Sequence, residues 1–124
     1  MTAPGTILVV EDDAFVRRFS IFVLQEHGFR TLEAFDGESG LDAFLRHKDE
    51  VDLVLTDVVM PQRSGPEMVE TLLNVKPSAK VVFMSGTAEP SEFPQQLKKV
   101  PILYKPFTAE RLVNFVRQSL SLAY

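Results

Sequence analysis

Short runs of aliphatic residues alternate along the chain with longer segments in which apolar residues recur every three or four positions. The clearest aliphatic runs lie at residues 7–10, 53–55, 81–84 and 102–104, and a weaker run lies at residues 30–34. Runs this short and this continuously apolar are typical of strands buried on both faces. The helical stripes begin at Phe15, Leu41, Met68 and Leu112. The alternation predicts an α/β fold with a doubly wound parallel sheet of five strands.

Residues 86–101 interrupt this alternation. A helix is expected between the fourth and fifth strands, but the segment carries Pro90, Pro94 and Pro101. Proline lacks a backbone N–H group and disfavours a helical conformation at the residue before it. We therefore expect the fourth helix to be short or irregular, beginning at Pro94 and ending near Val100.

Composition narrows the class of protein. A chain of 124 residues that is 45% hydrophobic is sized for one domain, so we expect residues 1–124 to fold as a unit. Cysteine is absent, no apolar run approaches the ~20 residues of a membrane helix, and the first residues lack the basic region of a signal peptide, so a soluble cytoplasmic protein is expected. The net charge of -4 argues against direct binding of nucleic acid.

Polar residues follow four of the predicted strands at the point where each ends. They are Asp12 and Asp13, Asp57, Ser85 and Lys105. Because the carboxyl ends of parallel strands meet at one edge of a sheet, these side chains are expected to share a site. Carboxylates suit a hard cation such as Mg²⁺, and a hydroxyl group and an amine suit phosphoryl oxygens. The pattern therefore predicts phosphoryl-transfer chemistry.

Each of these residues also has a purely structural interpretation. Asp13 can be the N-cap of the first helix and Asp12 a solvated loop acid, while serine before glycine is ordinary turn chemistry for Ser85. Lys105 can be a solvated lysine at a strand end. Three carboxylates at neighbouring strand ends are harder to explain by turns, because they repel each other unless a cation lies between them. The adjacent Glu11 is given only a supporting role.

Five motifs occur in an order that resembles the receiver domain of bacterial two-component response regulators. They are ILVVEDD at residues 7–13, LVLTDVVMP at 53–61, SG at 64–65, VVFMSGTA at 81–88 and YKPF at 104–107. The resemblance implies a flavodoxin-like fold of five parallel strands in the order 2-1-3-4-5, with five helices. The motifs are most similar to those of receivers attached to hybrid sensor kinases. A stand-alone regulator and a receiver that is part of a hybrid kinase are both compatible with the resemblance.

The resemblance also assigns roles at the site. It implies that Asp57 accepts a phosphoryl group from the phosphohistidine of a sensor histidine kinase or a histidine phosphotransfer protein. Asp12 and Asp13 would hold Mg²⁺ together with a side-chain oxygen of Asp57 and the backbone carbonyl of Val59.

Further expectations follow for the other strand ends. Ser85 would bond a phosphoryl oxygen, Lys105 would bridge to the phosphoryl group or Asp57, and the Lys105–Pro106 peptide bond would be cis. Family members often carry an aromatic residue three positions before the lysine, where this chain has Ile102. Tyr104 is the nearest aromatic residue.

A phosphatase and a binding module that is never phosphorylated are the two alternatives to this interpretation. Phosphatases of the haloacid dehalogenase type place a nucleophile and an acid two residues apart after the first strand, whereas Ala14 stands two positions after Asp12. A binding module that is never phosphorylated is disfavoured because all five functional positions are filled. We expect a phosphoacceptor regulator that promotes only its own phosphorylation and dephosphorylation, with no effector domain in this chain. A monomer and a homodimer both remain open.

Overall fold

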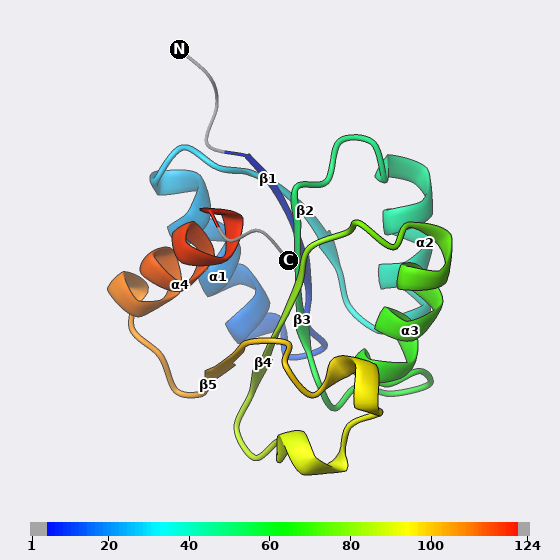
Figure 1. Ribbon diagram of the computed structural model, residues 1–124. Coiled ribbons are helices and arrows are strands. Elements are labelled where there is room, and N and C mark those ends of the chain that lie inside the picture. The colour runs from blue at the N-terminus through cyan, green and yellow to red at the C-terminus, as the bar shows by residue number, and fades with distance from the viewer. Residues whose placement is uncertain (1–4, 122–124) are drawn as a thin grey trace.

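A five-stranded parallel sheet runs through the middle of the molecule (Figure 1). The computed structural model describes residues 5–121. The strands are β1 (Thr6–Val10), β2 (Arg30–Ala34), β3 (Leu53–Asp57), β4 (Val81–Ser85) and β5 (Ile102–Tyr104). They lie in the order β2-β1-β3-β4-β5, and every neighbouring pair is parallel. The predicted doubly wound, flavodoxin-like sheet and its strand order are confirmed.

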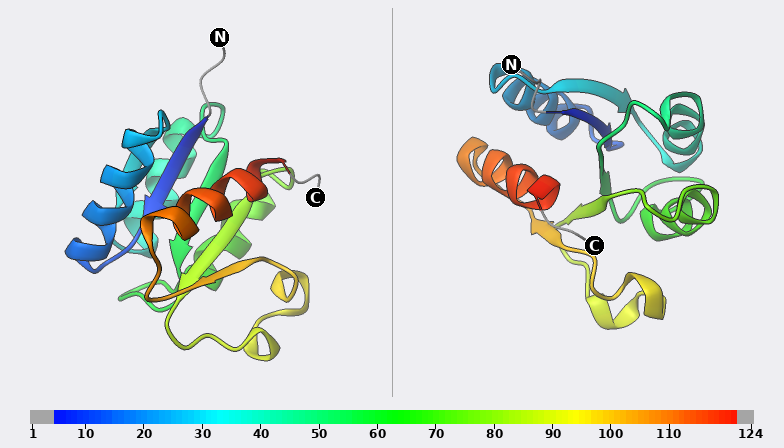
Figure 2. Two further views of the ribbon diagram at one scale, coloured as in Figure 1. Left: turned by 90° about the vertical axis from the view of Figure 1, so that its left-hand side faces the viewer. Right: turned by 45° about the horizontal axis from the view of Figure 1, so that its top comes forward.

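Helices cover both faces of this sheet (Figure 2). On one face lie α1 (Ala14–Glu26) and α4 (Ala109–Ser121), and on the other lie α2 (Gly37–His47) and α3 (Gly65–Val75). Capping boxes begin α2 and α3, and a Gly28 of positive φ follows α1. Among the described residues, no helix has both the length and the apolar character that a membrane span requires.

The two helical layers explain why the strands are apolar without alternation. Leu8 and Val10 of β1 pack into the core on the α2 and α3 side, whereas Ile7 and Val9 pack into the core on the α1 and α4 side. Successive side chains of a strand point to opposite faces, so a strand covered on both faces is apolar at most of its positions. Every residue of β1, β3 and β4 is accordingly buried.

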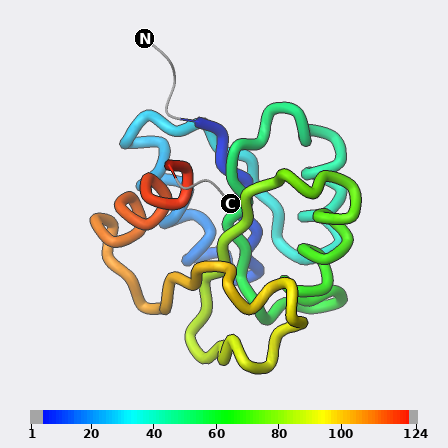
Figure 3. The backbone as a smooth tube through the Cα atoms, viewed as in Figure 1, coloured from blue at the N-terminus to red at the C-terminus, as the bar shows by residue number. Residues whose placement is uncertain are grey.

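The segment between β4 and β5 contains no α-helix. It forms two short 3₁₀ turns, η1 (Pro90–Glu92) and η2 (Gln95–Leu97), and passes beside α3 (Figure 3). The short, irregular fourth helix is thus confirmed, with two corrections. The described residues contain four α-helices instead of the five that the resemblance implied, and the second turn begins at Gln95, one residue after Pro94. Two buried side chains, Phe93 and Leu97, hold the segment to the core.

The strands bring the predicted polar residues to one edge of the sheet. Asp57 and Ser85 are the last residues of β3 and β4, and Lys105 directly follows β5. The segment Glu11–Asp12–Asp13 connects β1 to α1. The central position of β1 and β3 therefore places the acidic residues beside each other at this edge.

Candidate functional site

Three carboxylates gather where β1 and β3 end. Glu11, Asp12 and Asp57 each offer one carboxylate oxygen, and these oxygens lie within 4.8 Å of one another. Glu11 is fully buried and Asp57 is buried, whereas Asp12 is exposed. The cluster therefore consists of two buried carboxylates and one that is exposed to solvent.

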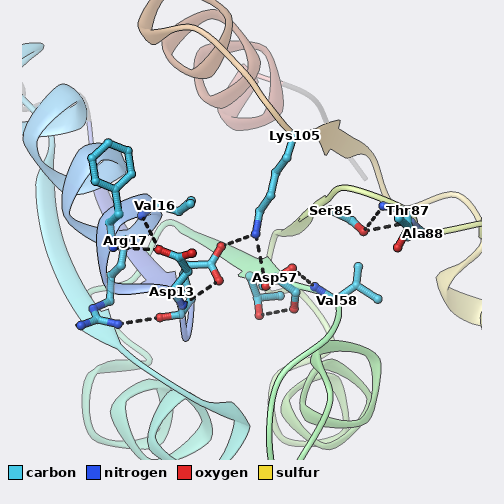
Figure 4. A network of polar contacts seen from close by, with 12 residues as sticks. Asp13, Val16, Arg17, Asp57, Val58, Ser85, Thr87, Ala88 and Lys105 are labelled. Atoms are coloured by element: carbon cyan, nitrogen blue, oxygen red, sulfur yellow. Dashed lines mark hydrogen bonds and ion pairs between the residues drawn. The ribbon is translucent and has the colours of Figure 1, made fainter.

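Lys105 is the positive charge in contact with this cluster (Figure 4). Its Nζ atom lies 2.5 Å from Oε1 of Glu11 and 3.3 Å from Oδ2 of Asp57. The ammonium group thus contacts two of the three carboxylates, and the ionised cluster with Lys105 carries an excess of two negative charges (three minus one). A buried ion pair of this kind needs further compensation, because charges removed from water are poorly stabilised.

Burial and the neighbouring charged groups together shift the pKa values of these residues. The pKa of Glu11 is raised, first by burial and then by the neighbouring Asp57, and the hydrogen bond from Lys105 only partly offsets this. Partial loss of hydration and the adjacent Glu11 raise the pKa of Asp12. Burial lowers the pKa of Lys105, but its carboxylate partners outweigh burial and the net pKa is raised. The lysine therefore stays charged, and its single positive charge does not fully compensate the negative charges of the carboxylates.

Asp13 occupies the beginning of α1 instead of the cluster. Its Oδ1 atom accepts hydrogen bonds from the backbone N–H groups of Phe15, at 2.9 Å, and Val16, at 3.1 Å, which makes it the N-cap of the helix. The carboxylates that the structure brings together with Asp57 are therefore those of Glu11 and Asp12, whereas the carboxylate of Asp13 caps the helix. The signal in the sequence was that β1 ends at Val10, which makes Glu11 the first polar residue past the strand.

Ser85 lies at the same edge, but its hydroxyl group faces its own turn. The Oγ atom accepts hydrogen bonds from the N–H groups of Thr87, at 3.1 Å, and Ala88, at 2.9 Å (Figure 4). Tyr104 donates from its hydroxyl group to the carbonyl of Ala88 at 3.3 Å. The structure therefore brings Lys105 into contact with Asp57 and leaves the Ser85 hydroxyl engaged in the turn that follows β4.

The Asp57 carboxylate is held between its own loop and the lysine. Its Oδ1 atom accepts from the N–H group of Val58 at 2.8 Å, and its Oδ2 atom faces Lys105. The N–H group of Gly65 donates to the carbonyl of Val58, which closes the loop that carries the exposed Val59. The expected cis peptide bond between Lys105 and Pro106 is present.

This set of donors suits a hard divalent cation. Carboxylate oxygens clustered at a partly open site are the ligands that Mg²⁺ takes in proteins, and the excess negative charge favours such an ion over a neutral ligand. Lys105 lies beside the carboxylate of Asp57, where it can stabilise negative charge that develops on an incoming group. The site can therefore bind a cation and present Asp57 as a nucleophile.

Comparison with known proteins adds an independent finding. Residues 7–117 match the model of the response regulator receiver domain. The chain is 35% identical to the sensor kinase CckA of Brucella abortus (strain 2308) over 97% of this chain, but it spans only 13% of that kinase. It is 34% identical to the response regulator receiver protein CpdR of the same organism, with 92% of this chain and 95% of CpdR covered.

A solved structure agrees with these matches. The receiver domain from the hybrid histidine kinase CckA superimposes with a TM-score of 0.80 at 33% identity, covering 94% of this chain and 100% of that domain. The chain is thus similar both to a domain within a large kinase and to a short protein of about its own length.

The contact between α3 and Asp57 yields a prediction on stability. A Cβ atom at Gly65 would lie 2.1 Å from the backbone oxygen of Asp57, whereas one at Gly86 would meet nothing within 4 Å. Gly65→Ala should therefore lower the free energy of unfolding by about 1–3 kcal/mol through forced backbone shifts. Gly86→Ala should change it by less than about 0.5 kcal/mol. Urea unfolding measures both, and equal losses would refute the close contact.

Proposed function

The chain belongs to the response regulator receiver family, and from this premise we propose that Asp57 is its phosphoacceptor. The phosphoryl group would come from the phosphohistidine of a sensor histidine kinase or a histidine phosphotransfer protein. The observation that carries the proposal is the position of the Asp57 carboxylate, which lies in the acidic cluster with Lys105 Nζ 3.3 Å from its Oδ2 atom. An anion formed there would have positive charge beside it.

Asp57 suits the nucleophile better than its acidic neighbours. Glu11 is fully buried and its carboxylate is in close contact with Lys105, so an incoming phosphoryl group has no access to it. Asp12 is exposed and has no hydrogen bond to Lys105 among the described residues. In the transfer, an O–P bond forms to Asp57 while the N–P bond of the phosphohistidine breaks. The bonding electron pair stays on the imidazole nitrogen.

Mg²⁺ fits the acidic cluster. Glu11, Asp12 and Asp57 would hold it, and the backbone carbonyl of Val59 is a further proposed ligand because it follows Asp57 in the same loop. When bound, the ion would neutralise phosphoryl oxygens and the excess charge of the carboxylates. Lys105 would contact the phosphoryl group from the other side. Ser85 would donate to a phosphoryl oxygen after leaving the turn in which it now accepts from Thr87 and Ala88.

We propose that the chain promotes only its own phosphorylation and dephosphorylation, as suits a regulator. Hydrolysis needs a water molecule aligned opposite the aspartyl oxygen, and the side chains two residues beyond Asp57 and two residues beyond Ser85 are the ones proposed to orient it. They are Val59 and Thr87. Valine neither donates nor accepts a hydrogen bond, and threonine is short. These two residues favour a long-lived aspartyl phosphate.

The expected setting is consistent with this role. We infer a single receiver domain over residues 1–124, a cytoplasmic location and a histidine kinase or phosphotransfer protein as the partner. The net charge of -4 supports the absence of direct contact with nucleic acid. A homodimer is compatible with the same function.

Phosphorylation of Asp57 is directly testable. Acetyl phosphate with MgCl₂ should add one phosphoryl group to the wild-type chain, seen by intact-protein mass spectrometry, and Asp57→Asn should remove the labelling. Asp49→Asn, at an exposed position beyond α2, serves as the matched control and should be labelled like the wild type. Labelling of Asp57→Asn at the wild-type level would place the acceptor elsewhere. An unlabelled wild type would favour a binding module without phosphoryl chemistry.

The proposed ligand set of Glu11, Asp12 and Asp57 can be distinguished from the expected pair of Asp12 and Asp13 by Mg²⁺ affinity. Asp12→Asn should weaken Mg²⁺ binding by about tenfold or more, because a charged oxygen ligand is lost. Asp13→Asn should leave the affinity close to that of the wild type, since asparagine caps a helix as well as aspartate does. Isothermal titration calorimetry gives both values. A loss of affinity in Asp13→Asn as large as in Asp12→Asn would restore Asp13 as a ligand.

A further inference from the structure

Arg17 of α1 contacts the backbone of Glu11, the first residue of the connection between β1 and α1. Its Nη1 atom donates to the carbonyl oxygen of Glu11 at 2.8 Å, and its Nε atom donates to Oε2 of Glu33 on β2 at 3.1 Å. The Arg17 side chain is only 14% exposed. The guanidinium group therefore links α1, the end of β1 and β2 directly beside the cluster.

We propose that Arg17 is a positioning residue for the cation site, an inference that rests on the proposed function. The peptide group that Arg17 holds is the one that joins Glu11 to Asp12, so the directions of both carboxylates depend on its orientation. The N–H group of Glu11 is held on the other side of the residue by the carbonyl of Ala34 at 3.1 Å. The main chain of Glu11 is thus fixed at both of its polar groups.

The rest of the β1–α1 connection is fixed by its own hydrogen bonds. The N–H group of Asp13 donates to Oε2 of Glu11 at 3.2 Å, and the N–H group of Arg17 donates to the carbonyl of Asp13 at 2.9 Å. Glu11 and Asp13 therefore each have two or more fixed contacts. Asp12 lies between them, exposed, and its direction follows from the peptide groups on either side.

The contribution of Arg17 comes from its shape more than from its charge. Glu33 neutralises the guanidinium group, so Arg17 adds little net field at the acidic cluster. Its planar fork reaches the Glu11 carbonyl and the Glu33 carboxylate at the same time, and an ammonium group, as a point charge, cannot reproduce both bonds. Arg17→Lys therefore keeps the positive charge but cannot form both hydrogen bonds at the same time.

The test uses Mg²⁺ affinity and the Mg²⁺ dependence of phosphorylation by acetyl phosphate. Arg17→Lys should weaken Mg²⁺ binding by about five- to tenfold in calorimetry, as the loss of an outer-shell partner does. The half-maximal Mg²⁺ concentration for labelling of Asp57 should rise by the same factor, while the rate at saturating Mg²⁺ stays near that of the wild type. A merely structural role would lower stability without this shift.

Arg46→Lys is the matched control. Arg46 pairs with Asp42 on the surface of α2, with side chains 72% and 62% exposed, and its substitution should leave Mg²⁺ affinity unchanged. Wild-type affinity in a folded Arg17→Lys variant overturns the inference, as does an equal loss in both variants. If Arg17→Lys fails to fold, Glu33→Ala decides, because it removes the acceptor that holds the Arg17 guanidinium group in place: weaker Mg²⁺ binding supports the inference and unchanged binding overturns it. A wild type that binds no Mg²⁺ instead refutes the proposed cation site itself.

Discussion

The imbalance of charge at the end of β1 and β3 is the constraint on which the rest of the site depends. Glu11, Asp12 and Asp57 lie within reach of one ion, and Lys105 supplies one positive charge to them. Removing carboxylates from water is costly unless positive charge or hydrogen bonds compensate for it. Burial is the first cause of the raised pKa values of Glu11 and Asp12, and the neighbouring carboxylates add to it. A cation-dependent function is the simplest role for such a cluster.

The fold meets this constraint by holding the acidic residues in place from every side. The central strands β1 and β3 are buried on both faces, which fixes the starting points of both acidic loops. Beyond the strands, Gly65 packs against the backbone of Asp57, and Arg17 holds the carbonyl of Glu11. Rigid supports of this kind keep like charges together that would otherwise move apart.

Much of this arrangement could be predicted from the sequence. The strands are short, continuously apolar runs, the helices have apolar residues every three or four positions, and polar residues stand where strands end. The sequence offered Asp13 both as a metal ligand and as the N-cap of the first helix, and the hydrogen bonds that its carboxylate accepts from Phe15 and Val16 show the capping role. In the segment between β4 and β5, the prolines predicted a short or irregular helix but did not predict the two 3₁₀ turns. The contact of Arg17 with Glu33 joins a helix to a strand sixteen residues away, and no periodicity indicates it.

The most direct test of a cation-completed acidic cluster is the dependence of stability on Mg²⁺. The cluster exists only in the folded chain, so a bound ion should raise the free energy of unfolding by RT ln(1 + [Mg²⁺]/Kd). Urea unfolding in rising MgCl₂, compared with KCl at equal ionic strength, measures this term separately from screening. The structure predicts a logarithmic gain in MgCl₂ that KCl does not reproduce. Identical unfolding free energies in the two salts at every matched ionic strength would contradict it.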